Sequence, residues 1–151
     1  MKQILVYGDS LSWGIIPGTR QRFEFDVRWP GAMEKTLVDL GHDVRVIEDC
    51  LNGRTTSLEH TSKPGRNGAI GIEQRIEVNS PLVLVIIFLG INDFQSMHQM
   101  GAHDTAQRIK RLVEAVRQAP IEAGMVHPDV LLIAPPLIRP SADPIRYIHG
   151  G

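Results

Sequence analysis

The segment from Leu82 to Leu89 is apolar at every position. A strand with one wet face alternates apolar and polar residues, whereas a strand of a parallel sheet is covered on both faces and forms a continuous apolar run. The whole apolar stretch, Pro81 to Gly90, is about half of the roughly 20 residues that a membrane-spanning helix needs. The run therefore predicts the central strand of a parallel sheet.

Shorter apolar runs predict three further strands. They lie at Ile4 to Tyr7, Val44 to Ile47 and Val130 to Ala134, and the last of these is closed by Pro135-Pro136. Each run is rich in β-branched residues and is followed by turn-forming residues. We expect all three to be short, buried strands of the same sheet.

Helical spacing of apolar residues predicts helices between these strands. One helix is expected from Pro30 to Leu40, and a second, short helix around Ile72. A third begins after Asp104 as N-cap. The positions on the apolar faces of the second and third helices are Ile70, Ile72 and Ile76, and Ile109, Leu112, Val113 and Val116.

The order of these elements is β-α-β-α-β-α-β, which implies right-handed crossovers and helices on both faces of the sheet. At 151 residues and 16.8 kDa, the chain is long enough for one domain, residues 1–151. After Pro140 the sequence lacks a further helix and strand. We expect a C-terminally incomplete domain with exposed apolar surface at Leu131 and Ile133.

Composition excludes several classes of protein. The hydrophobic fraction of 42% and the spread of Gly and Pro are those of a globular chain. A formal net charge of -1 gives no electrostatic reason to bind nucleic acid or anionic lipid. The single cysteine, Cys50, cannot form an internal disulfide, and the N-terminus has no signal-peptide pattern. A cytoplasmic location is expected.

Polar segments follow three of the strands, at the edge where parallel α/β sheets bind ligands. They are Gly8-Asp9-Ser10-Leu11-Ser12, Asn52-Gly53-Arg54 and Gly90-Ile91-Asn92-Asp93. A nucleophilic serine needs a sharp turn, oxyanion donors and a base. Ser10 meets the first requirement, and its own N–H, the Gly53 N–H and the Asn92 amide can supply the donors.

Three sequence blocks resemble the GDSL, or SGNH, hydrolase superfamily: Gly8 to Gly14, Gly53, and Gly90 to Asp93. Further segments are similar to its arylesterase and acyltransferase branch: Phe25 to Gly31, Val46 to Glu48, Arg54 to Thr56, Asn67-Gly68, Leu84 to Ile87 and Ala134 to Pro136. The resemblance implies a flavodoxin-like three-layer α/β/α sandwich, a homo-oligomer, no cofactor and a small-molecule ester as substrate.

Carried over by position, the resemblance makes Ser10 the nucleophile and Gly53 and Asn92 members of the oxyanion hole. Leu11, Trp13, Ile15 and Ile91 are the expected substrate-pocket residues, although Trp13 and Ile15 fit a core role equally well. Asp9 and Asp93 are expected to be structural hydrogen-bond acceptors. Arg28-Trp29 resembles a family segment near a subunit interface, but as an isolated pair it is more typical of a stacked surface pair.

The family's catalytic histidine comes from an Asp-x-x-His block near the C-terminus, and this sequence does not have that block. The one such spacing, Asp39 to His42, precedes the second strand and so lies at the wrong edge of the sheet. His149 has Arg146 three residues before it instead of an aspartate. We expect the catalytic base to be absent from these 151 residues.

The remaining residues indicate no second chemistry. The positions of His60, His98, His103 and His127 match no metal-ligand spacing, so they are expected to be surface histidines and no metal is implied. Cys50 is expected to be a small buried hydrophobe.

Two functions remain open. One is a serine esterase of short-chain aryl or acetyl esters, with possible transfer to alcohols. The other is a non-catalytic, truncated family member that retains the fold and an ester-binding cleft.

Overall fold

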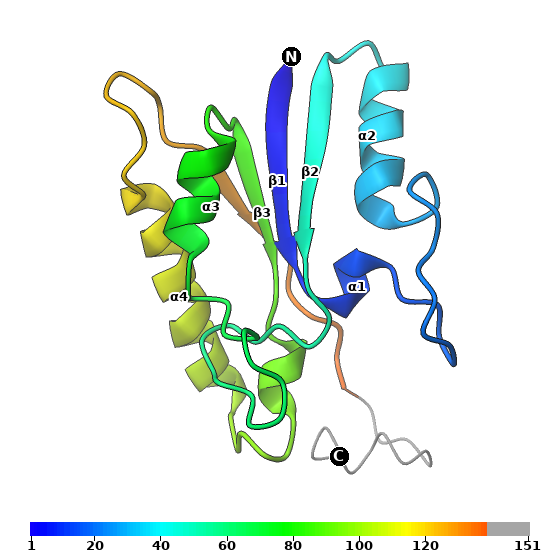
Figure 1. Cartoon of the computed structure of the whole chain (residues 1–151), viewed down its shortest axis with the longest axis vertical. Coiled ribbons are helices and arrows are strands. Elements are labelled where there is room, and N and C mark those ends of the chain that lie inside the picture. Colours follow the sequence, from blue (N-terminus) through cyan, green and yellow to red (C-terminus); the bar gives the residue numbers. More distant parts are fainter. Residues whose placement is uncertain (139–151) are drawn as a thin grey trace.

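The computed structural model describes residues 1–138. Their core is a parallel sheet with the strand order β2-β1-β3-β4 (Figure 1). The strands are β1 (Lys2–Gly8), β2 (Val44–Cys50), β3 (Leu84–Phe88) and β4 (Asp129–Leu132). All three strand pairs are parallel, as the sequence predicted.

Helices cover both faces of the sheet and make a three-layer sandwich (Figure 1). On one face lies α2 (Trp29–Asp39), and on the other lie α3 (Ile72–Asn79) and α4 (Ala102–Gln118). The short helix α1 (Ser10–Trp13) and the 3-10 helix η1 (Ile91–Phe94) follow the carboxyl ends of β1 and β3. The predicted α/β/α architecture is confirmed.

Alternate residues of β3 enter two separate cores. Val85 and Ile87 belong to the cluster beneath α3 and α4, whereas Ile86 belongs to the cluster beneath α2. All three are at most 2% exposed. Burying an aliphatic side chain of this size contributes about 1.5–3 kcal/mol. The continuous apolar run of this segment is therefore explained by two buried faces.

Several element boundaries differ from those predicted. β1 and β2 each extend over polar residues, because their register pairs Lys2 with Val44 at one end and Gly8 with Cys50 at the other. α3 begins at Ile72, so Ile70 lies outside it and is 65% exposed. Pairing with a neighbouring strand and burial of one helix face set these limits, and local propensity does not.

Asp104 is not the N-cap of α4, contrary to the prediction. The helix begins at Ala102, after Gly101, and Asp104 lies within its first turn. The Asp104 carboxylate accepts a hydrogen bond from the Gly101 N–H at 3.2 Å. An acidic side chain in the first turn that accepts from the N-cap N–H satisfies a donor at the helix end, which is the part that Asp104 plays here.

The strand predicted from Val130 to Ala134 is found, but the prediction that it is buried is wrong. β4 is an edge strand that ends at Leu132, and Leu131 and Leu132 are 47% and 49% exposed. The exposure expected at Leu131 is confirmed. Ile133 is only half-buried, because it packs against the cluster beneath α2.

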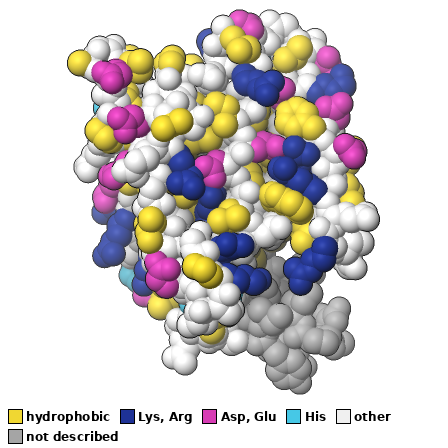
Figure 2. All heavy atoms as spheres, viewed as in Figure 1, with side chains coloured by type: hydrophobic (Ala, Val, Ile, Leu, Met, Phe, Trp, Pro, Cys, Tyr) yellow, Lys and Arg dark blue, Asp and Glu magenta, His cyan; other side chains and the backbone are white. Residues whose placement is uncertain are grey.

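Acidic and basic side chains are interspersed on the face shown in Figure 2, with hydrophobic ones between them. Within residues 1–138, no helix is both long and apolar enough to cross a membrane. The sequence predictions for Pro140, Arg146 and His149 lie outside the described residues.

Candidate active site

Ser10 lies on the turn that joins β1 to α1. The turn is tight: a Cβ at Gly8 would lie 2.5 Å from Ser12 Oγ. Asp9 is the N-cap, and its Oδ1 accepts from the Leu11 N–H at 2.9 Å. Ser10 is therefore the first helical residue, and it is half-buried. The strand-to-helix turn that a nucleophilic serine needs is present at the predicted position.

Asn92 joins this turn to the loop after β2. It is buried in η1, and its Nδ2 donates to Arg54 O at 3.0 Å and to Asp9 Oδ2 at 3.3 Å. Its Oδ1 accepts from Gln95 Nε2 at 3.0 Å, which fixes the orientation of the amide. The convergence predicted for the three polar segments is thus found.

The Asn92 amide already has an acceptor for each of its two hydrogens. An oxyanion can receive a bond from this amide only by replacing or sharing one of these acceptors. The hydrogen bond to Asp9 Oδ2 is the longer and weaker of the two, so it is the one that an oxyanion would more easily replace.

Gly53 lies in the turn after β2 with a φ of 79°, in the left-handed region that favours glycine. A Cβ at this position would come no closer than 3.7 Å to Arg66 Cγ, so backbone conformation and not lack of space explains the glycine. Within the described part of the chain, neither the Gly53 N–H nor the Ser10 N–H has a hydrogen-bond acceptor. With respect to residues 1–138, both donors are therefore unoccupied.

Arg54 lies beside the Gly53 turn, and the sequence predicted no individual role for it. Its side chain is buried, and its Nη1 donates to Gly8 O at 3.2 Å and to Asp49 O at 2.6 Å. Nη2 forms an ion pair with Asp49 Oδ1 at 2.6 Å, and the guanidinium lies 4.1 Å from the centre of the Tyr7 ring. One buried cation thereby ties the end of β1 to the Gly53 loop.

Two buried carboxylates hold the loops together. Asp93 accepts from the Thr56 N–H at 2.9 Å and from the Thr56 hydroxyl, which links η1 to the loop after β2. Asp9 has the N-cap and Asn92 contacts described above. The predicted role of both aspartates as structural acceptors is confirmed. Burial raises the pKa of Asp9 to about 6, although the Leu11 N–H and the Arg54 charge oppose the shift.

The predicted pocket residues surround this turn but do not share a described cavity. Leu11 is 41% exposed, and Trp13, Ile15 and Ile91 are half-buried. An apolar cavity of about 760 Å³ lies instead between α4, β4 and residues 133–138. None of the four residues lines it. Their role in substrate binding stays a prediction.

The histidines divide into two groups. His103 and His127 are exposed, as predicted, but His60 and His98 are half-buried, with ring centres 6.5 Å apart. These two are therefore partly covered surface histidines, and no metal-ligand group is found among the described residues. His42 is exposed and follows α2 at the end of the sheet opposite α1 (Figure 1).

Within residues 1–138, no histidine is hydrogen-bonded to Ser10. The part of the chain that is described therefore does not provide the third requirement, a base in contact with the serine. Cys50 is half-buried, and burial raises its pKa to about 12, so it is a thiol at neutral pH and not a second nucleophile.

The fold and the site define a class of α/β protein in which a serine turn, a glycine turn and a buried asparagine meet at the carboxyl edge of a parallel sheet. Residues 6–148 match the model of the GDSL-like Lipase/Acylhydrolase family, and the chain belongs to that family.

Two solved structures are similar over nearly the whole chain. The inhibitor-bound aryl esterase of M. smegmatis has a TM-score of 0.90 at 35% identity, and the match covers 99% of this chain and 71% of that one. Est24, a carbohydrate acetylesterase from Sinorhizobium meliloti, has a TM-score of 0.91 at 34% identity, covering 100% and 72%.

A curated relative is the "Arylesterase" of Vibrio mimicus, 33% identical over 92 residues. That match covers 61% of this chain and 38% of the relative.

Proposed function

We propose that this protein is a serine esterase that hydrolyses short-chain aryl or acetyl esters through an acyl-enzyme on Ser10. The observation that carries the proposal is the amide of Asn92, which bonds to both the Ser10 turn and the Gly53 loop. Membership of the acylhydrolase family and similarity to an aryl esterase and a carbohydrate acetylesterase support the substrate class.

In this mechanism, Ser10 Oγ attacks the ester carbonyl and its proton passes to a general base. The carbonyl oxygen becomes an oxyanion that accepts from the Ser10 and Gly53 N–H groups and from Asn92. The attack forms the bond from the acyl carbon to Oγ; collapse of the intermediate then re-forms the carbonyl and breaks the bond to the alcohol, which takes the proton from the base. Water, giving its proton to the same base, then attacks the acyl carbon, and Ser10 Oγ leaves with that proton as the carboxylic acid is released. An alcohol in place of water completes an acyl transfer, the second activity that we propose.

The base in this mechanism is a histidine of the Asp-x-x-His type that the family resemblance implies. No histidine of residues 1–138 is hydrogen-bonded to Ser10, and His149 lies outside the described residues. The second candidate function follows from this point. A member of the family without a working base would keep the fold and an ester-binding cleft and would not turn substrate over.

Hydrolysis of p-nitrophenyl acetate, with a sample of verified intact mass, tests both candidates. The matched control is Ser10→Ala, which removes a single oxygen. Where the sample has a working base, Ser10→Ala should lower turnover by orders of magnitude, because loss of a triad member leaves only the catalysis of about 10³–10⁴-fold over water that the oxyanion hole and binding supply. Equal background rates in the two proteins would establish the non-catalytic alternative.

Two further expectations stay predictions. They are a homo-oligomeric assembly, which the resemblance implies, and a cytoplasmic location, which the single cysteine and the N-terminal sequence favour. The substrate is expected to be a small molecule, since the net charge of -1 gives no reason to bind nucleic acid.

A further inference from the structure

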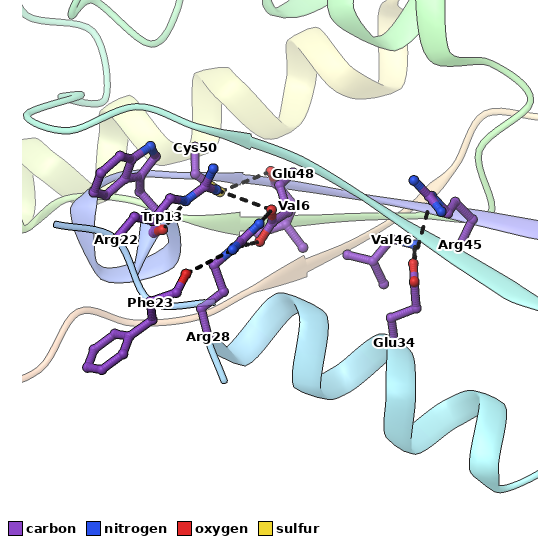
Figure 3. Close-up of polar contacts among 10 residues, drawn as sticks. All are labelled: Val6, Trp13, Arg22, Phe23, Arg28, Glu34, Arg45, Val46, Glu48 and Cys50. Carbon is purple, nitrogen blue, oxygen red and sulfur yellow. Dashed lines mark hydrogen bonds and ion pairs between the residues drawn. The ribbon is translucent and has the colours of Figure 1, made fainter. Parts of the chain in front are cut away.

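Glu48 lies on β2 with its carboxylate between two arginines of the loop that joins α1 to α2 (Figure 3). Arg28 donates to both carboxylate oxygens, at 2.7 Å from Nε and 2.6 Å from Nη2. Arg22 Nη2 donates to Oε2 at 3.2 Å. The side chains of Glu48 and Arg28 are only 10% and 11% exposed, so this is a paired and largely desolvated carboxylate.

Arg22 connects this carboxylate to the helix that carries Ser10. Its Nε donates to Trp13 O, the last residue of α1, at 2.7 Å, and its guanidinium lies 4.9 Å from the centre of the Trp13 ring. Figure 3 shows the Arg22 side chain between the Trp13 indole and Glu48. A single arginine therefore satisfies a helix-end carbonyl and covers an aromatic side chain at the same time.

We infer that Glu48 and Arg22 are positioning residues for the Ser10 helix. Glu48 holds Arg22, and Arg22 holds both the end of α1 and the Trp13 ring. α1 has four residues and too few internal hydrogen bonds to fix its own position, so its two ends must be held from outside. Asp9 holds the first end, and Arg22 holds the second together with the Phe23 N–H, which donates to Gly14 O at 2.8 Å. The effect of this pair on catalysis rests on the proposed esterase function, whereas its effect on Trp13 does not.

The first readout is the fluorescence of Trp13, which needs no activity. The chain has two tryptophans, so Trp29→Phe leaves Trp13 as the only fluorescent indole. Because Trp29 Nε1 donates to Ser12 Oγ of α1 at 3.2 Å, the Trp29→Phe protein is the parent for every quenching comparison. In this background we expect Glu48→Gln and Arg22→Lys to increase acrylamide quenching of Trp13 about twofold, because a loosened guanidinium uncovers the ring. The measurement is made below the unfolding transition of each variant, so that loss of global stability alone would not change it.

Glu34→Gln is the matched control. Glu34 is also a poorly exposed carboxylate that contacts β2, through the Val46 N–H at 2.6 Å, and it lies 3.9 Å from Arg45 (Figure 3). It has no contact with α1, so we expect its variant to leave Trp13 quenching unchanged. Folded Glu48→Gln and Arg22→Lys proteins with the quenching of the parent would overturn the inference.

The second readout is kinetic. A displaced nucleophile lowers kcat more than it raises KM, so we expect about a tenfold or greater fall in kcat for p-nitrophenyl acetate in both variants and less than a threefold change in KM. A kcat that stays within twofold of the parent would refute the catalytic part. If the parent itself shows no Ser10-dependent turnover, the proposed function fails, and the quenching result still decides whether the pair positions α1.

Discussion

Asn92 Nδ2 donates to Asp9 Oδ2 at 3.3 Å, across 83 positions of the sequence. The contact joins the residue before the candidate nucleophile to the residue expected to stabilise the oxyanion. In the resting site, the Asp9 carboxylate occupies one of the two hydrogens that Asn92 can offer. In the proposed mechanism, the carbonyl oxygen therefore replaces or shares one of the acceptors of Asn92, and the longer contact with Asp9 is the first to give way.

Removing the Asn92 amide should slow the chemical step. We expect Asn92→Ala to lower kcat for p-nitrophenyl acetate by about 10²–10³-fold with little change in KM, as for the loss of one oxyanion donor. The control is Asn79→Ala, which removes an amide of the same kind that bonds Arg75 O within α3. Equal loss of activity in the two variants would indicate a general effect on folding instead.

The buried Asp9 carboxyl should make stability depend on pH. Its pKa is about 6 in the folded chain and 3.8 in the unfolded chain, so the folded state holds the proton more tightly. Its contribution to stability is complete below pH 3.8 and is lost as the pH rises to about 6. The loss amounts to about 3 kcal/mol, because one pKa unit corresponds to about 1.4 kcal/mol.

Urea unfolding at pH 4 and pH 7 measures this effect. Asp9→Asn should show a smaller fall in unfolding free energy between the two pH values, since the amide does not titrate. The exposed Asp26 supplies the control, and Asp26→Asn should keep the pH dependence of the parent. If Asp9→Asn has the same pH dependence as the parent, then Asp9 does not hold a proton in this range.

The sequence allows the sheet and the converging loops to be predicted because each depends on a local signal. The apolar run of β3 requires two covered faces, and the carboxyl ends of parallel strands must meet at one edge. Burial of β4 could not be predicted in the same way. After Asp129 its residues are as apolar as those of β3, but exposure at Leu131 depends on β4 lying at the edge of the sheet that residues 1–138 form.

The residues that support the site were harder to find from sequence. Arg54 and Glu48 are charged, and charged residues are ordinarily assigned to the surface. Both are buried because their partners come from other elements: Asp49 and Gly8 O for Arg54, and two loop arginines for Glu48. The only local signal for the buried position of Arg54 is that it follows the turn residue Gly53 and has an opposite charge, Asp49, five positions earlier.

Arg54 should contribute strongly to stability. We expect Arg54→Met to lower the free energy of unfolding by about 3 kcal/mol, the lower end of the range for a broken buried ion pair. The lower end applies because Asp49 keeps a second partner, Arg75, at 2.6 Å. Arg54→Lys should recover only part of the loss. The planar guanidinium donates to Gly8 O and to two acceptors of Asp49 at once, and a lysine ammonium lacks this array of donors.

Urea unfolding of both variants checks this prediction, with Arg45→Met as the control. Arg45 is 62% exposed and lies 3.9 Å from Glu34, so its removal should change the unfolding free energy by less than about 0.5 kcal/mol. A similar small change in Arg54→Met would mean that the buried guanidinium does not hold the two strand ends together.

The backbone at Gly53 should be needed for the oxyanion hole more than for the fold. Gly53→Ala places a side chain at a φ of 79° without a steric clash, so we expect it to cost about 1–2 kcal/mol of stability. Gly18→Ala is a matched control, because Gly18 has a φ of 73° and open space around its Cβ position. Both variants should lose similar stability in urea unfolding. Only Gly53→Ala should lower kcat, by about tenfold or more, because relaxation of the turn moves one proposed oxyanion donor. Equal kcat values in the two variants would exclude the Gly53 N–H from the site.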